Sequence, residues 1–237
     1  MIVVLLPRGE WAVGALCRLD EDEAHHLRVR RAEVGEVVGV RDGVGLVGSG
    51  KLSRVGDGWA IELERAESAP RPAPTVLAVG AGDRDRLALV VEKAAELGVT
   101  AVVPVETVRT AGVATRLRAA HLDKLRRQAL EALKQTGSAW AMALDDLVSL
   151  ARFLEASRSG SRWVADAEGD PPPAQLGSVA VTVLVGPEGG FTESEHDAIV
   201  AAGFHPTKLG AHTLRFETAA IAAAAAVNAA RLRGSDG

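Results

Sequence analysis

The chain of 237 residues contains a single cysteine, Cys17, which excludes an internal disulfide framework and a cysteine-based zinc site. The adjacent His25 and His26 have no cysteine partner and point in different directions, so no metal is expected. Aromatic residues make up only 3% and tyrosine is absent, which argues against base recognition on an aromatic stacking platform. No apolar run is long enough to cross a membrane, and no convincing signal peptide is present. We therefore expect a cytoplasmic protein without a membrane partner.

The chain has a small net negative charge, but its basic residues are locally concentrated. The formal net charge is −4 and the isoelectric point is about 5.9, which argues against blanket nucleic-acid binding. Residues 109–134 nevertheless hold seven basic side chains against two acidic ones, and a second basic group follows the acidic run 20–23. Such groups can follow a phosphate backbone, although a solvated helix face explains most charge runs. The residues that we predict for RNA contact are His25, Arg28, Arg31, Arg109, Lys124 and Arg127.

The proline-rich segment 69–74 is the clearest domain boundary, because alternating prolines favour extended backbone and cannot lie inside a helix or central strand. Short apolar segments with glycine-rich turns precede it, and they predict a small β-barrel with one helical turn near residues 21–30. The predicted domains are therefore residues 1–69 and 75–237, joined by a linker at 70–74.

The part of the chain after the linker alternates between strand and helix patterns, which predicts an α/β fold: a parallel sheet with flanking helices. Pro104 is expected to end one strand, and Gly98 has the position of a helix C-terminal glycine. Strands are expected at 75–79, 100–103, 163–165 and 179–185, helices at 87–97, 116–135 and 217–233, and a loop at 168–173.

The most informative segment is 179–195, in which a strand typical of burial on both faces leads into the glycine-rich turn 186–190. Thr192 and Glu195 have the spacing of a capping box, which predicts that a helix begins here. Open α/β sheets bind ligands at the carboxyl ends of their strands, so a ligand is expected at this turn. A tight turn without a ligand is the alternative. Neither Gly-x-Gly-x-x-Gly nor a Walker motif follows a strand, which removes the main support for a nicotinamide or nucleoside triphosphate site.

A second segment, Lys208-Leu209-Gly210-Ala211-His212-Thr213-Leu214-Arg215-Phe216-Glu217-Thr218-Ala219-Ala220, leads through an irregular loop into an alanine-rich helix. Together with the turn Gly186-Pro187-Glu188-Gly189-Gly190, it resembles the signature of the RsmE family. These SPOUT-class methyltransferases use S-adenosylmethionine to methylate N3 of a uridine in small-subunit (16S) ribosomal RNA. The resemblance spans most of the chain. Residues 24–31 are similar to the family's His-Leu, Val-Leu-Arg element, residues 41–45 to its Asp-Gly turn, and residues 92–99 to its Lys-Ala-Thr-Glu-Leu-Gly helix end.

The resemblance implies a SPOUT-type knotted parallel sheet preceded by a PUA-like β-barrel domain that binds RNA. It also implies a homodimer that acts on ribosomal RNA or the small ribosomal subunit, and S-adenosylmethionine as cofactor. Glycine-rich turns and apolar slots suit that cofactor, whereas plain core packing is the alternative for the leucines. The implied cofactor-binding residues are Leu184, Gly186, Pro187, Glu188, Gly190, Leu209, Gly210, Thr213 and Leu214.

Arg215 and Glu217 are the residues that we predict for catalysis. Methylation of uridine N3 requires loss of the N3 proton, and a guanidinium group would stabilise the anion that remains. The alternatives for Arg215 are a phosphate clamp or an ion pair with Glu217. Glu217 could act as the base, or it could favour the positive end of the helix that it begins.

The chain departs from the family pattern at Ala81, Ser138, Ala211, His212 and Phe216. The family has lysine or arginine at some of these positions, so the departures concern RNA affinity and the target base more than the cofactor site. Ribose 2′-O methylation by another SPOUT enzyme and a non-catalytic RNA-binding relative therefore stay open as alternative functions.

Overall fold

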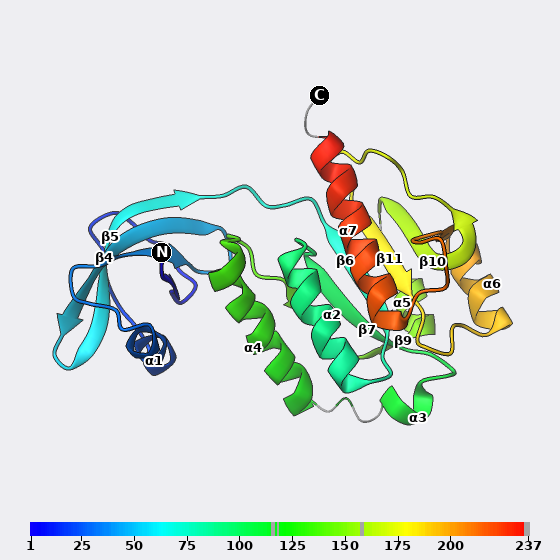
Figure 1. Ribbon diagram of the computed structural model, residues 1–237, viewed down its shortest axis with the longest axis horizontal. Coiled ribbons are helices and arrows are strands. Elements are labelled where there is room, and N and C mark those ends of the chain that lie inside the picture. The colour runs from blue at the N-terminus through cyan, green and yellow to red at the C-terminus, as the bar shows by residue number, and fades with distance from the viewer. Residues whose placement is uncertain (115–116, 118, 157–158, 235–237) are drawn as a thin grey trace. The chain divides into compact units, whose positions relative to one another are not determined.

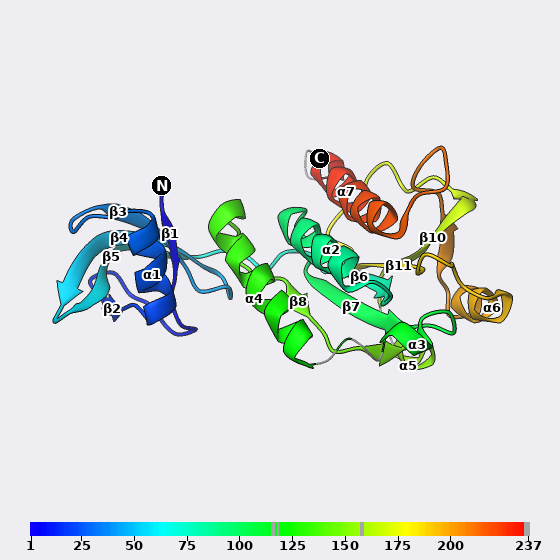
Figure 2. The same cartoon turned by 60° about the horizontal axis from the view of Figure 1, so that its bottom comes forward.

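The computed structural model describes residues 1–114, 117, 119–156 and 159–234 (Figures 1 and 2). Contacts divide the chain into two compact units. The first comprises Met1–Pro72 and Leu130–Ala141, and the second comprises the rest of the chain. The division falls at Pro72, within the proline-rich segment, and again within a long helix, which the sequence did not indicate.

The first unit is built on a five-stranded sheet in the order β1-β3-β4-β5-β2. β1 and β3 pair in parallel, and the other neighbours are antiparallel. Apolar side chains of the sheet pack with Ala24 and Leu27 of helix α1, whose N-terminus is capped by Asp20. The elements are β1 (Val3–Leu5), β2 (Leu16–Arg18), α1 (Glu21–Val29), β3 (Val37–Arg41), β4 (Leu46–Val55) and β5 (Gly58–Ser68).

A buried ion pair also belongs to the first unit. Lys134 Nζ lies 2.6 Å from Glu23 Oε1, and the two side chains are only 8% and 5% exposed. Burial raises the pKa of Glu23, and Lys134 acts in the opposite direction. The pair ties the first turn of α1 to the last turn of α4 (Ala119–Thr136).

The second unit is built on a parallel sheet in the order β12-β10-β11-β6-β7-β8, and β9 also pairs with β7. Its strands are β6 (Thr75–Gly80), β7 (Ala101–Glu106), β8 (Ala143–Leu144), β9 (Val148–Ser149), β10 (Ser161–Asp170), β11 (Val181–Val185) and β12 (His205–Thr207). Its other helices are α2 (Arg84–Glu96), α3 (Ala111–Ala114), α5 (Leu150–Glu155), α6 (Glu193–Ala201) and α7 (Phe216–Gly234).

Helices cover both faces of the parallel sheet, as the sequence predicted. One face packs against apolar side chains of α2, α4 and α7, and the other packs against α5 and α6 (Figures 1 and 2). The strand β11 is buried along its whole length between these layers. The expected capping box at Thr192 and Glu195 is present, and Gly98 has the positive φ of +75° that the end of α2 requires.

Two expectations about strands were wrong. Pro104 does not end its strand but lies inside β7, in register with Val79 of β6. On the opposite side, β8 pairs with Ala101 and Val102 and β9 pairs only from Val105 onward, so Pro104 lies between these two partners. A proline is tolerated there because neither β8 nor β9 pairs with residue 104, so its missing N–H removes no hydrogen bond between strands on that side.

The prediction of a loop at 168–173 was also wrong for residues 168–170, because β10 continues to Asp170. Asp170 pairs with Thr207 after a break in register. A Cβ atom at Gly169 would lie 2.4 Å from the carbonyl carbon of Pro206, so glycine allows the two backbones to meet. The predicted start of the helix 116–135 and the basic residues Arg116 and Arg118 lie outside the described residues.

Candidate active site

A cavity of about 680 Å³ opens at the carboxyl end of β11, beside residues 165–167 of β10. This is the edge at which parallel sheets bind ligands. Its walls come from α2, residues 165–167 of β10, the glycine-rich turn with the start of α6, and the loop that leads into α7. The lining residues are Arg86, 165–167, 185–188, 190–193, His196, 209–210, 212–216 and Ala219.

The glycine-rich turn is shaped by close backbone approach. A Cβ atom at Gly80, the last residue of β6, would lie 2.5 Å from the nitrogen of Pro187. Gly190 has a φ of +70°, and its N–H donates to the carbonyl of Pro187 at 2.8 Å, which closes the turn. The side chain of Arg109 packs over the turn, with its Cδ 3.1 Å from where a Cβ of Gly189 would be. Glycine is therefore required by space at Gly80 and by conformation at Gly190.

The capping box at the start of α6 fixes both the turn and the segment that carries Arg109. The Glu195 carboxylate accepts from the Thr192 backbone N–H at 2.9 Å and, through its other oxygen, from the Val108 backbone N–H at 2.8 Å. Glu195 is 9% exposed, so both hydrogen bonds are sheltered from solvent. The capping box thus also holds Val108, the residue before Arg109, at the start of α6.

The opposite wall is the loop between β12 and α7. Leu209 packs against the core, and a Cβ atom at Gly210 would lie 3.2 Å from Cδ2 of Leu214. The carbonyl of Arg215 accepts the first hydrogen bond of α7, from Ala219 N–H at 2.8 Å. Arg215 itself is exposed and lines the cavity, whereas Phe216 beside it is buried. The loop therefore anchors apolar side chains in the core and leaves a guanidinium group at the cavity.

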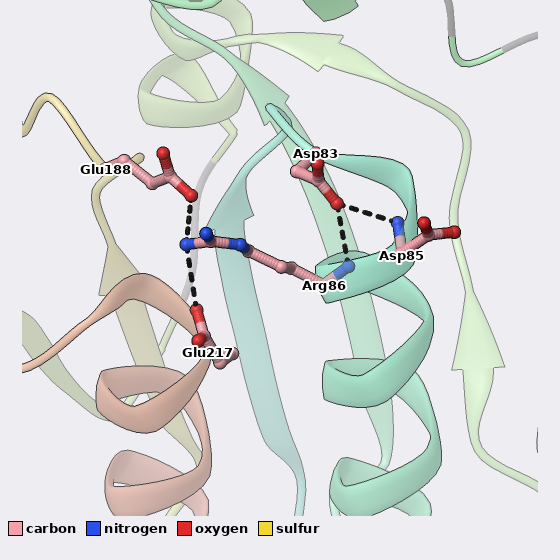
Figure 3. Close-up of polar contacts among 5 residues, drawn as sticks. All are labelled: Asp83, Asp85, Arg86, Glu188 and Glu217. Atoms are coloured by element: carbon pink, nitrogen blue, oxygen red, sulfur yellow. Dashed lines mark hydrogen bonds and ion pairs between the residues drawn. The ribbon is translucent and has the colours of Figure 1, made fainter.

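Arg86 connects the two walls (Figure 3). Its Nη1 contacts Glu188 of the turn and lies 3.4 Å from Oε2 of Glu217 in the first turn of α7. Asp83 caps α2 by accepting from the backbone N–H groups of Asp85 at 2.9 Å and Arg86 at 3.0 Å. The hydrogen bond from Arg86 is the largest of the effects that hold the pKa of Asp83 below its usual value.

A second polar pair lies on the β10 side of the cavity. His196 Nε2 on α6 is 3.2 Å from Oδ2 of Asp166, and both residues line the cavity. The sequence reasoning named neither residue. The signal that could have identified Asp166 is its place directly after the predicted strand 163–165, where a parallel sheet binds ligands.

Most of the predicted cofactor residues come together in this cavity, which is lined by Gly186, Pro187, Glu188, Gly190, Leu209, Gly210, Thr213, Leu214 and the predicted catalytic Arg215. Leu184 instead packs its side chain into the core beneath α5 and α6. Glu217 is 17% exposed, does not line the cavity and pairs with Arg86. The sequence reasoning missed Arg86. A basic residue in the first turn of a helix opposes the helix dipole, and that unusual placement could have drawn attention to it.

The residues predicted for RNA contact are all exposed, but they belong to different units. His25, Arg28 and Arg31 lie on or just after α1 in the first unit, and Arg28 pairs with Glu21. Arg109, Lys124 and Arg127 belong to the second unit, the last two on α4.

The residues present fit S-adenosylmethionine in size and character. A cavity of about 680 Å³ lies within the range of small-molecule sites, and glycine leaves the backbone of the turn accessible. Apolar residues such as Val185, Leu209 and Leu214 line one part of it, and charged residues such as Arg86 and Glu188 line another. Among the described residues, no group of three or more His, Cys, Asp or Glu side chains could hold a metal ion. Within the same residues, no helix has both the length and the apolar character that a membrane span needs.

Comparison with known proteins points to one family. The family model for an RNA methyltransferase domain matches residues 69–228, and that for an RNA methyltransferase PUA domain matches residues 19–58. The ribosomal RNA small subunit methyltransferase E of Aquifex aeolicus is 30% identical over 217 residues, 88% of this chain and 92% of the relative. The Synechocystis protein of the same name is 29% identical over 95% of this chain and 77% of its own length.

The same likeness extends to a solved structure. The ribosomal RNA small subunit methyltransferase E of Neisseria gonorrhoeae, bound to S-adenosyl methionine, superposes with a TM-score of 0.83 at 26% identity, over 95% of this chain and 96% of that one.

Proposed function

We propose that this chain, which belongs to the ribosomal RNA small subunit methyltransferase E family, methylates N3 of a uridine in 16S ribosomal RNA. It is an RNA methyltransferase that uses S-adenosylmethionine. The observation that carries the proposal is the cavity at the carboxyl ends of the strands, where the glycine-rich turn and the loop before α7 meet with Arg215 at the wall. The choice of uridine N3 rests on the family.

The residues of the cavity suit such a reaction. S-adenosylmethionine supplies an electrophilic methyl group on a positively charged sulfur. For N3 to accept it, the uracil ring would lose its N3 proton to solvent, and the N3–methyl bond would form as the sulfur–methyl bond breaks, with S-adenosylhomocysteine as the leaving group. Arg215 would stabilise the resulting negative charge on the ring, because a guanidinium group stays protonated and presents its N–H donors in a fixed plane. Glu217 is held by Arg86, which favours a role for Glu217 in placing the start of α7 over a role as base.

The wider assignment follows from the family as well. We propose a homodimer, a trefoil knot in the SPOUT sheet, and a cytoplasmic location, where ribosomal subunits are assembled. RNA would be bound through the exposed basic residues His25, Arg28, Arg31, Arg109, Lys124 and Arg127.

Methyl transfer from labelled S-adenosylmethionine to small-subunit particles, followed by nucleoside analysis, tests the proposal. We expect N3-methyluridine in the 16S RNA. A 2′-O-methylated nucleoside would replace the proposal by the ribose-methylating alternative. Binding of RNA without any transfer would favour a non-catalytic relative.

The variant Arg215→Lys tests the assigned role of Arg215. It keeps the positive charge but loses the planar set of donors, so we expect transfer to fall by roughly tenfold or more. The affinity for S-adenosylhomocysteine, measured by calorimetry, should change little because backbone groups would hold most of that ligand. Full activity of the variant would remove Arg215 from the mechanism and leave the enzyme assignment intact.

A further inference from the structure

Arg86 occupies a position that the stability of its own helix does not explain. It lies in the first turn of α2, where the positive end of the helix dipole disfavours a cation. Asp83 fixes this turn through two backbone hydrogen bonds, one of them from Arg86 itself. The guanidinium group is thereby directed at the two carboxylates of Glu188 and Glu217 (Figure 3).

The charges around the cavity indicate what Arg86 does there. The acidic and arginine residues that line it are Asp166, Glu188 and Glu193 on one side of the balance and Arg86 and Arg215 on the other. Glu217 adds a further carboxylate directly behind Arg86. Without Arg86, Glu188 and Glu217 would leave two uncompensated negative charges at and next to the cavity in which, under the proposed function, the uracil ring becomes an anion. A nearby like charge opposes the ionisation of a group, so these carboxylates would oppose ionisation of the substrate.

We propose that Arg86 is a positioning residue that neutralises Glu188 and Glu217 and so allows an anionic nucleobase to form beside the cofactor. The inference rests on the proposed function, because only a nucleobase that ionises needs this compensation. It assigns no proton transfer to Arg86, since an arginine side chain does not lose its proton in proteins.

Charge compensation has a signature that a purely structural role lacks. The sulfur of S-adenosylmethionine carries a positive charge, whereas the sulfur of S-adenosylhomocysteine is neutral. Removal of the Arg86 charge should therefore favour the cationic ligand relative to the neutral one. Loss of a structural contact would instead weaken both ligands by the same factor.

The experiment is a calorimetric titration of both ligands against wild type, Arg86→Gln, Arg86→Lys and Arg84→Gln. Arg84 is a matched control, because it lies in the same helical turn, is exposed and does not line the cavity. We expect the ratio of the two dissociation constants to shift roughly fivefold toward S-adenosylmethionine in Arg86→Gln, as expected for one unit charge near the ligand under strong solvent screening. Arg86→Lys and Arg84→Gln should keep the wild-type ratio.

An unchanged ratio in a folded Arg86→Gln protein would overturn the proposal. If that variant does not fold, Glu188→Gln decides in the opposite sense, because removal of a negative charge should shift the ratio toward S-adenosylhomocysteine. In that case, an unchanged ratio of the two dissociation constants in Glu188→Gln would also overturn the proposal. In the methylation assay, Arg86→Gln should lower kcat more than it alters KM for the cofactor.

The proposed function can fail separately. A wild-type protein that binds both ligands but methylates no RNA would refute the methylation, while the ligand ratio still reports whether Arg86 compensates the carboxylates.

Discussion

Gly190 illustrates how single residues shape the cavity. Its φ of +70° lies in the left-handed region, and its N–H closes the turn by donating to Pro187. The guanidinium group of Arg109 is the nearest neighbour of a Cβ built there, at 3.7 Å. The requirement for glycine at this position is therefore conformational more than steric, because a larger side chain would find space but an unfavourable backbone.

We predict that Gly190→Ala lowers the free energy of unfolding by about 1 kcal/mol through left-handed strain. It should also weaken S-adenosylhomocysteine binding, because relief of the strain moves the turn that carries Glu188. Chemical denaturation and calorimetric titration measure the two effects.

Gly56 offers a matched control for that prediction. It has a φ of +62° in the tight turn between β4 and β5, and no atom lies within 4 Å of a Cβ built there. Gly56→Ala should cost similar stability without loss of ligand affinity. A folded Gly190→Ala protein with wild-type affinity would show that the turn does not contact the ligand.

At the scale of the elements, α4 carries one basic residue that makes structural contacts and two basic residues that are exposed. Arg126 donates to the carbonyl of Leu144 at 2.9 Å and pairs with Asp123 and Asp146, so its charge is largely compensated. Lys124 and Arg127 are exposed on the same helix. The helix can thus stabilise the second unit through one residue and attract phosphate groups through its neighbours.

We predict that Arg127→Ala weakens RNA binding and reduces the salt dependence of the affinity by about one phosphate contact. Titration of RNA at several salt concentrations measures this slope. Arg126→Ala is the matched control and should lower stability while it preserves the slope. If both variants behave alike in the RNA titration, the assigned role of Arg127 is wrong.

At the scale of the whole molecule, α7 has a buried side and a half-buried side. Phe216, Ala220, Ala223, Val227 and Ala230 are among the residues that face the core. The half-buried side contains the small residues Ala222, Ala225 and Ala229, and Leu232 is exposed at its end. Residues of this size allow close approach of a second helix, which agrees with the proposed homodimer.

We predict that light scattering at micromolar concentration gives a mass of twice the 24.7 kDa of one chain. Ala225→Glu places a charge on the half-buried side of α7 and should produce a folded monomer, because an unpaired charge is costly inside an interface. A monomeric wild-type protein would refute the dimer. An unchanged dimer of Ala225→Glu would place the interface elsewhere.

The sequence by itself determined the features that depend on neighbouring residues. The apolar strand, the glycine-rich turn and the capping box of Thr192 and Glu195 follow from residues only a few positions apart, and the structure contains all three. The alternation of strand and helix patterns after residue 74 was sufficient to predict the layered parallel sheet. Together with the second motif before α7, these local signals located most of the cavity.

Only the tertiary structure decided which distant residues meet. Arg86 and Glu217 are 131 positions apart, and Lys134 reaches Glu23 from the opposite half of the chain. Pro104 is accommodated within β7 because of the gap between two partner strands, which no pattern within β7 itself reveals. Capping and periodicity act over one or two turns of chain, whereas ion pairs and strand partners depend on how separate segments pack. The charge balance of the cavity is therefore a property of the fold, although each of its residues is visible in the sequence.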